Sequence, residues 1–207
     1  MHVLVVLCHP RASSFCAELA GRVRAGAAAA GATVELADLY REGFDPVFRD
    51  GDYVQFEGGA MPPEILAEQA RVERSDAIAL VSPVWWLGLP AMLKGWFDRV
   101  WSNGWAYEWS NNPEGSLLRP RPFLFVLSAA GSPGTYARYG YAPALDALLR
   151  TGLLGWCGVS ASTVAILHDT GFDAAASDGH LAYGETLGAA LVGGVAAAPA
   201  PGVTLLV

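Results

Sequence analysis

Residues 77–100 read AIALVSPVWWLGLPAMLKGWFDRV, and this stretch decides the fold. Residues 77–81 are apolar at every position, which is typical of a strand buried on both faces of a parallel sheet. After a short loop, Pro90 occupies the place where proline is tolerated in the first turn of a helix. Apolar residues then recur at helical spacing: Leu93, Phe97 and Val100. The stretch therefore predicts a buried strand, a loop and a crossover helix.

The same alternation continues in both directions. Further apolar runs that predict strands cover residues 3–7, 33–39, 123–127 and 159–167. Helical spacing separates them, as in Phe15, Leu19 and Val23, and an alanine-rich segment follows the last run. Five strands that alternate with helices predict a doubly wound α/β fold, with one five-stranded parallel sheet and helices on both faces.

The composition indicates a single folded domain. The chain has 207 residues, of which 53% are hydrophobic and 16% charged, so disorder is excluded. We expect one domain over residues 1–198, and a C-terminal tail over residues 199–207, because Pro199 and Pro201 interrupt the last helix. With 20 acidic and 13 basic residues, a formal charge of −7, the chain lacks the broad basic surface that nucleic acid requires.

The cysteines and the chain ends predict a cytoplasmic protein without membrane insertion. The three cysteines, Cys8, Cys16 and Cys157, form no CxxC pair, which argues against a disulfide framework or a structural zinc site, and we expect no metal. The first ten residues lack the basic region of a secretory signal. The apolar C-terminal stretch is interrupted by prolines, so we do not expect it to span a bilayer.

Ligands of doubly wound sheets bind in the loops that follow the strands. In the first such loop, His9 to Phe15, Ser13 and Ser14 stand beside a helix N-terminus, where free backbone N–H groups favour phosphate. The same hydroxyls are equally typical of ordinary helix caps, and both interpretations stay open. No GxGxxG or Walker loop is present.

Two other loops carry aromatic and small residues. Trp85 and Trp86 are adjacent after the third strand, where they either meet a planar ligand or pack on the helix that contains Trp96 and Trp101. The loop that begins at Ser128 contains alanines and glycines, which allow the backbone to approach a ligand closely.

Five segments together resemble the flavin-dependent NAD(P)H:quinone oxidoreductases, a family of flavodoxin-like fold. They are HPRASSF at 9–15, LADLYREGFDPVF at 36–48, AEQARVERSDAIALVSPVWWLGLPAMLKGWFDRVW at 67–101, GWAYEW at 104–109 and LLGWCGV at 153–159. The resemblance covers residues 1 to about 167 in order and spacing. It implies a homodimeric enzyme that passes hydride from NAD(P)H through a flavin to a quinone or similar planar acceptor, in a ping-pong reaction.

The resemblance also implies roles for residues at matching positions. The flavin contacts implied are His9, Ser14, Phe15, Cys16, Gln69, Pro83, Val84, Trp85, Trp86, Leu87, Ser128, Ala129, Ala130 and Gly131. Cys16 replaces a residue that is commonly Asn in the family. Gln69 matches a glutamine of FAD-using relatives, which favours FAD, with FMN the alternative. Tyr107 and Trp109 match aromatic residues that cover the substrate from the partner subunit.

The family's catalytic residues are matched less completely in this sequence than its flavin contacts. Tyr136 matches a tyrosine that helps to neutralise the reduced flavin, but the histidine of the mammalian-type relatives falls on Ala142. Tyr139 is a candidate substitute, although it is equally consistent with a solvent-facing side chain. His168 ends the fifth strand, where it is a candidate to approach a neighbouring subunit's pocket, although a lone histidine at a strand end is usually a surface or capping residue. Two other functions remain alternatives, namely a flavin-binding electron carrier and an accessory or regulatory subunit of a transport system.

Overall fold

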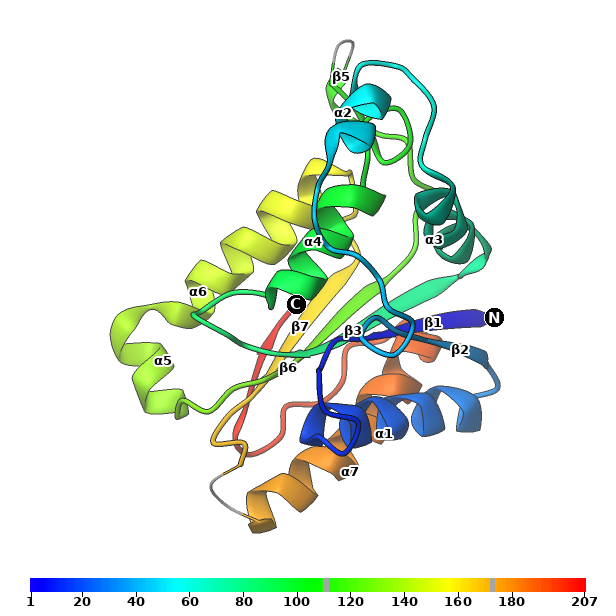
Figure 1. Ribbon diagram of the computed structural model, residues 1–207. Coiled ribbons are helices and arrows are strands. Elements are labelled where there is room, and N and C mark those ends of the chain that lie inside the picture. The colour runs from blue at the N-terminus through cyan, green and yellow to red at the C-terminus, as the bar shows by residue number, and fades with distance from the viewer. Residues whose placement is uncertain (110–111, 172–173) are drawn as a thin grey trace.

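The computed structural model describes residues 1–109, 112–171 and 174–207. A six-stranded sheet in the order β2-β1-β3-β6-β7-β8 forms its centre, and its first five strands are parallel (Figure 1). The strands are β1 His2–Leu7, β2 Thr33–Asp38, β3 Ala77–Pro83, β6 Phe123–Ser128, β7 Ser162–Leu167 and β8 Val203–Leu206. The predicted doubly wound α/β fold is confirmed.

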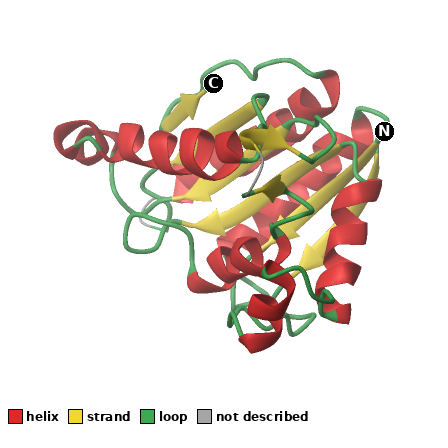
Figure 2. Ribbon diagram, turned by 90° about the horizontal axis from the view of Figure 1, so that it is seen from above, coloured by secondary structure: helices red, strands yellow, loops and turns green. Residues whose placement is uncertain are grey.

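Helices cover both faces of this sheet, as Figures 1 and 2 show. One face carries α1 Phe15–Ala29 and α7 Ala174–Gly193. The other face carries α3 Pro63–Arg74, α4 Ala91–Val100, α6 Tyr141–Asp146 and the π-helix η1 Ala147–Leu154. Shorter elements are α2 Asp50–Phe56, α5 Pro133–Tyr139, β4 Tyr107–Glu108 and β5 Asn112–Ser116.

Alternate residues of each strand enter two hydrophobic cores. In β1, Val3 and Val5 face α1 and α7, whereas Leu4 and Val6 face the opposite helices, and all four are fully buried. Burial of a side chain of this size stabilises the fold by about 1.5–3 kcal/mol. Because both faces are covered, the strands are apolar throughout, which is the pattern that the sequence showed.

The C-terminal segment corrects the predicted strand count. We expected a tail over residues 199–207, but Val203–Leu206 form β8, which pairs antiparallel with β7. The chain turns at Pro201 and Gly202, and β8 then satisfies the hydrogen-bonding groups along the edge of β7. Within the described ranges, no helix is both long and apolar enough to cross a membrane.

Two other boundaries differ from the prediction. The strand expected over residues 159–167 begins only at Ser162, because Val159 closes the turn after η1 with a hydrogen bond to the carbonyl of Leu154. The helix expected to end at Gly152 continues as a π-helix to Leu154. Neither feature follows from side-chain periodicity, since both depend on local backbone geometry.

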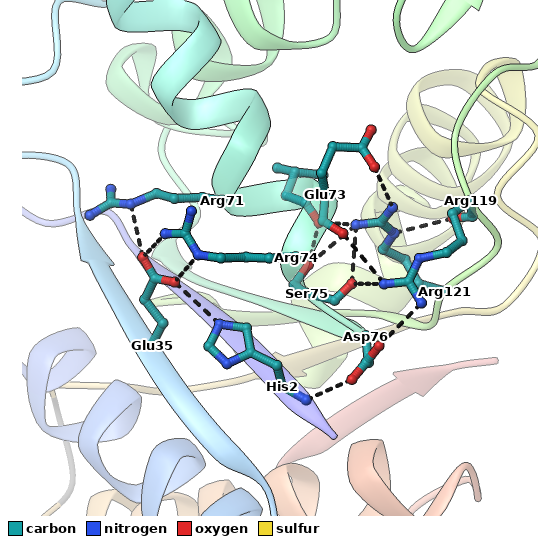
Figure 3. A network of polar contacts seen from close by, with 10 residues as sticks. His2, Glu35, Arg71, Glu73, Arg74, Ser75, Asp76, Arg119 and Arg121 are labelled. Atoms are coloured by element: carbon teal, nitrogen blue, oxygen red, sulfur yellow. Dashed lines mark hydrogen bonds and ion pairs between the residues drawn. The ribbon is translucent and has the colours of Figure 1, made fainter.

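Charged side chains tie the amino-terminal ends of neighbouring strands together (Figure 3). Glu35 at β2 accepts hydrogen bonds from Arg74 at 2.6 and 3.0 Å and pairs with Arg71 at 3.0 Å. The backbone N–H of His2 donates to Asp76, just before β3, at 2.7 Å. Burial opposes ionisation of Glu35, but the hydrogen bonds from Arg74 and His2 outweigh it and hold its pKa below the ordinary value.

Helices α1 and α7 pack so closely that glycine is required at their contact. A Cβ atom at Gly26 would lie 1.9 Å from the carbonyl oxygen of Glu185, and one at Gly188 would lie 2.1 Å from that of Val23. Both neighbours are backbone atoms of helices, which cannot move aside cheaply. By contrast, Gly21 on the same helix α1 has nothing within 4 Å of its Cβ position.

We predict that Gly26→Ala lowers the free energy of unfolding by at least about 2 kcal/mol, because overpacking at a helix contact costs about 1–3 kcal/mol and the helices must separate. Gly21→Ala is the matched control and should stabilise the protein by about 0.5–1 kcal/mol through helix propensity. Urea denaturation measures both. Equal effects of the two substitutions would show that α1 and α7 do not touch at Gly26.

Candidate functional site

The register of the parallel strands brings three loops together at one edge of the sheet. Leu7 of β1 pairs with Val81 of β3, and Pro83 of β3 pairs with Ser128 of β6. The three strands therefore end side by side, and we call the edge formed by residues 8–15, 83–88 and 128–132 the mouth. Backbone hydrogen bonds connect its loops, for example from Val84 N–H to the Ser128 carbonyl at 2.8 Å.

The first loop ends at the N-terminus of α1. Ser14 is its N-cap and accepts a hydrogen bond from Ala17 N–H at 3.1 Å, so the capping interpretation of this hydroxyl is confirmed. The N–H groups of Phe15 and Cys16 precede the first intrahelical bond and have no acceptor in the described part of the chain. Together with the helix dipole, these two donors suit an anionic group.

The Cys16 side chain points into the protein. It is 2% exposed, and its thiol faces the Ser128 hydroxyl at the end of β6. Burial raises the pKa of its thiol to about 12, and the bond to Ser128 offsets only part of that rise. What Cys16 offers at the mouth is consequently its backbone N–H, for which the side chain matters little.

The second loop is a tight hairpin. Trp85 and Gly88 exchange two hydrogen bonds of 3.1 Å, and the two residues between them, Trp86 and Leu87, have φ of 49° and 59°. Left-handed backbone at residues other than glycine costs about 1–3 kcal/mol each. Trp86 is 103% exposed, so it does not pack on the helix with Trp96 and Trp101, which was one of the two interpretations.

The hairpin also meets the first loop. The His9 imidazole lies edge-on to Trp85, with ring centroids 6.2 Å apart. His9 accepts a hydrogen bond from Arg11 N–H at 3.1 Å, which fixes the turn before α1. The partly exposed indole of Trp85 therefore stands beside the loop that leads to the helix N-terminus.

The third loop, residues 128–132, lies with its backbone close to the surface. Ala129 N–H donates to the Leu167 carbonyl at 2.8 Å, whereas the N–H groups of Ala130 and Gly131 have no acceptor among the described residues. A Cβ atom at Gly131 would lie 3.0 Å from the Tyr136 ring, so a larger residue there would displace the loop or the ring. These free donors suit carbonyl or anionic groups of a ligand.

The two tyrosines predicted to be catalytic occupy different environments. Tyr136 is buried beneath the third loop and packs edge-on against Tyr141 and His168, and burial raises the pKa of its phenol. Tyr139 is 61% exposed and stacks on Tyr141 at 5.5 Å. The structure therefore does not pair them as donors to one ligand atom, and Ala142, at the position of the family histidine, is buried.

Gln69 is not part of the mouth. It lies on α3, is buried, and its side-chain amide donates to the Val100 carbonyl at 3.1 Å and to Ser102 Oγ at 3.0 Å. Both amide hydrogens are engaged in holding the C-terminal end of α4. A flavin contact from Gln69 stays a prediction, and within the single chain these two bonds occupy its amide hydrogens.

Tyr107 and Trp109 lie in the insertion after α4 and line a cavity of about 470 Å³ with Trp156 and Phe56. Helix α4 is about 15 Å long and begins at the mouth, so the insertion lies at its far end, as Figure 1 shows. The structure does not bring these two side chains to the mouth of their own chain. Trp109 is 64% exposed, which leaves it free to contact another molecule.

His168 is the site residue that sequence reasoning missed. It follows β7, is 1% exposed, and its ring nitrogens hydrogen-bond the Gly131 carbonyl at 3.0 Å and Thr204 Oγ1 at 2.8 Å. Burial lowers the pKa of this imidazole despite the hydrogen bond to Gly131. One signal was available in the sequence, namely its position directly after a buried strand at the ligand-binding edge.

Fold and mouth together define a doubly wound α/β protein, a class in which ligands bind at the carboxyl ends of the strands. Residues 1–187 match the family described as flavodoxin-like fold, so the chain belongs to that family. The resemblance predicted from sequence is confirmed. Among the residues that the structure describes, no cluster of His, Cys, Asp or Glu is arranged to hold a metal ion.

Several characterised or named proteins are similar to this chain. An uncharacterised NAD(P)H oxidoreductase of Haemophilus influenzae is 31% identical over 160 residues, which cover 77% of this chain and 79% of the relative. NAD(P)H dehydrogenase [quinone] 1 of Rattus norvegicus is 26% identical over 81% of this chain and 69% of its own. A solved NAD(P)H:quinone oxidoreductase from Methanothermobacter marburgensis has 31% identity and a TM-score of 0.84, over 92% of this chain and 96% of that one.

We predict that Trp86→Gly raises the free energy of unfolding by about 0.5–1 kcal/mol, because glycine relieves the left-handed strain and the exposed indole buries no surface. Leu87→Gly is the matched control, with the same strain and no indole, and should behave alike. Urea denaturation measures both. Trp96→Ala, which leaves a cavity in the core, should lower the free energy of unfolding by about 3–5 kcal/mol. Marked destabilisation by Trp86→Gly would contradict an unpacked, strained hairpin.

The three thiols should be inert in the folded protein. Burial raises the pKa of Cys8 and Cys16 to about 12 and that of Cys157 to about 11, so no thiolate forms at neutral pH. Because the thiol pKa values are higher in the folded than in the unfolded protein, the buried thiols contribute fully to the free energy of unfolding below about pH 9. That contribution is lost as the pH rises toward 12. Reaction with a disulfide reagent at pH 8 should be rapid only in denaturant. A native thiol that reacts at the unfolded rate would disprove this burial.

Proposed function

We propose that the chain is a flavin-dependent NAD(P)H:quinone oxidoreductase. One observation carries this proposal: the unpaired N–H groups at the start of α1 and the fully exposed indole of Trp86 lie at the same edge of the sheet. An anion site beside an aromatic wall suits a ligand with phosphate at one end and a planar ring at the other. The named relatives point to the same activity.

Each part of the mouth receives a role in this proposal. Residues of the first loop, His9, Ser14, Phe15 and Cys16, hold the flavin phosphate through backbone N–H groups. Residues of the hairpin and its approach, Pro83, Val84, Trp85, Trp86 and Leu87, lie along the ring. Residues of the third loop, Ser128, Ala129, Ala130 and Gly131, donate to its polar edge. A bound flavin would supply the hydride transfer between NAD(P)H and the acceptor.

The proposed roles of the tyrosines follow from their exposure. Tyr139 is accessible and remains a candidate proton donor, whereas Tyr136 supports the third loop from below. Burial raises the pKa of the Tyr136 phenol, so the group keeps its proton and is available as a hydrogen-bond donor. The hairpin excludes water from one side of the ring, which strengthens the hydrogen bonds of the third loop.

We propose a cytoplasmic homodimer in which Tyr107 and Trp109 of one subunit cover the substrate slot of the other. The support is the separation of these residues from their own mouth by α4, together with the exposed aromatic surface of the insertion. Twofold association places the insertion of each chain beside the other's mouth. Sedimentation of the purified protein measures the mass.

We propose FAD as the flavin, on the family resemblance, with FMN the alternative. Gln69 lends this choice no support within one chain, because its amide hydrogens are engaged. In this proposal one domain of each chain supplies all the flavin contacts.

The deciding experiment is the absorbance spectrum of the purified protein and the identification of its released cofactor. We expect a yellow protein that bleaches anaerobically with NADH or NADPH and regains its colour with a quinone. Colourless protein that neither FAD nor FMN reconstitutes would overturn the proposal. Flavin that is bound but not reduced by NADH or NADPH would indicate an electron carrier or an accessory subunit instead.

A further inference from the structure

The third loop of the mouth rests on the segment that follows β7. Thr170 N–H donates to the Ala129 carbonyl at 3.1 Å, and Thr170 Oγ1 lies 2.8 Å from Ser128 Oγ. His168 Nδ1 lies 3.0 Å from the Gly131 carbonyl. Residues 168–170 thus hold two of the carbonyls in a loop whose outward N–H groups are the ligand donors of the proposed function.

The His168 ring is itself held from every side. Its second nitrogen lies 2.8 Å from Thr204 Oγ1 on β8, and its face receives the edge of Tyr136 at a centroid distance of 4.7 Å. Its backbone N–H donates to the Gly202 carbonyl at 2.9 Å, and its backbone carbonyl lies 2.8 Å from His180 Nε2. The imidazole has no freedom to turn.

These partners assign the tautomer. The Gly131 carbonyl can only accept, so Nδ1 carries the proton and donates. In the neutral ring Nε2 is then an acceptor, and the Thr204 hydroxyl donates to it. The Gly131 carbonyl therefore fixes the proton on the nitrogen that faces the loop, and Thr204 holds the opposite nitrogen.

Peptide planarity converts these bonds into an orientation. In a trans peptide the carbonyl points opposite to the N–H of the next residue. Because the Ala129 carbonyl points to Thr170, the Ala130 N–H points away from residues 168–170. The Gly131 carbonyl points to His168, so the Ser132 N–H also points away, and neither N–H has an acceptor among the described residues.

We propose that His168 is a positioning residue for ligand binding at the mouth: by holding the Gly131 carbonyl, it directs the Ser132 N–H, in register with the Ala130 N–H, toward the ligand. The partner of these two donors is a carbonyl-bearing or anionic ring edge. Its identification as the pyrimidine edge of a flavin rests on the proposed function, whereas the orientation of the loop does not. His168 contacts no reacting atom.

Two substitutions of His168 distinguish the roles of its two ring nitrogens. In His168→Asn the amide nitrogen stands near the position of Nδ1 and retains the donor to Gly131. In His168→Gln the longer side chain places its amide near Nε2 and loses that donor. Thr204→Val, at an edge strand, leaves the imidazole in place and removes only the hydroxyl that holds its Nε2.

The experiment titrates FMN and FAD into the full-length apoprotein of all four chains and compares dissociation constants and the absorbance bands of the bound flavin. Loss of one positioned hydrogen bond should weaken binding by about five- to ten-fold in His168→Gln and about two- to five-fold in Thr204→Val. His168→Asn should bind within about two-fold of the wild type, with an unchanged spectrum. Far-UV circular dichroism confirms that each variant is folded, and Thr204→Val answers the question if a His168 variant is not.

A second readout does not need flavin. Nitrogen-15 NMR of the apoprotein should show His168 as the Nδ1–H tautomer, and the amide signals of residues 130–132 should shift in His168→Gln but not in His168→Asn. Equal flavin affinity and equal amide shifts in His168→Asn and His168→Gln would overturn the inference. If no chain binds flavin while the amide shifts behave as expected, the proposed function fails and the positioning role stands.

Discussion

The parallel register of β1, β3 and β6 is the constraint on which the rest of the structure depends. Leu7 pairs with Val81 and Pro83 pairs with Ser128, so the three strands end within two residues of one another. The loops that follow them therefore lie side by side, and each presents different groups. A slip of one residue would turn every side chain to the opposite face and exchange the residues of the two cores, so core packing enforces the geometry of the mouth.

Stability and binding are divided between the two ends of the sheet. At the amino-terminal edge, Glu35 and Asp76 pair with arginines, and the buried Arg121 donates to the Val72 carbonyl and to Ser75 (Figure 3). These bonds join α3 to the starts of β1, β2 and β3. The carboxyl-terminal edge is left with unpaired backbone N–H groups, which cost stability until a ligand accepts from them. Because the amino-terminal edge stabilises the sheet, the backbone N–H groups of the mouth can stay unpaired without unfolding the protein.

Much of the fold was predictable because it depends on local patterns, whereas several site features were not. Uniformly apolar strands and helical spacing gave the sheet and its crossovers. The pairing of residues 203–206 with β7 is a contact between distant segments that periodicity does not encode. The partners of Gln69 and His168 were not predictable for a related reason: a residue's type states which bonds it can form, but the tertiary structure decides which ones it does form.

Backbone strain gives an independent argument for the mouth. Within the described part of the chain, three residues other than glycine have a positive φ, namely Trp86, Leu87 and Asp169. All three follow the carboxyl end of a strand, two in the hairpin and one directly after His168. Strain of about 1–3 kcal/mol per residue persists only where the surrounding structure imposes it. Here the strain at Trp86 exposes an indole, and the turn at Asp169 lets His168 and Thr170 reach the same loop. The residues that violate local preference are therefore those that shape the mouth, which is expected where a backbone has been selected to present groups to a ligand.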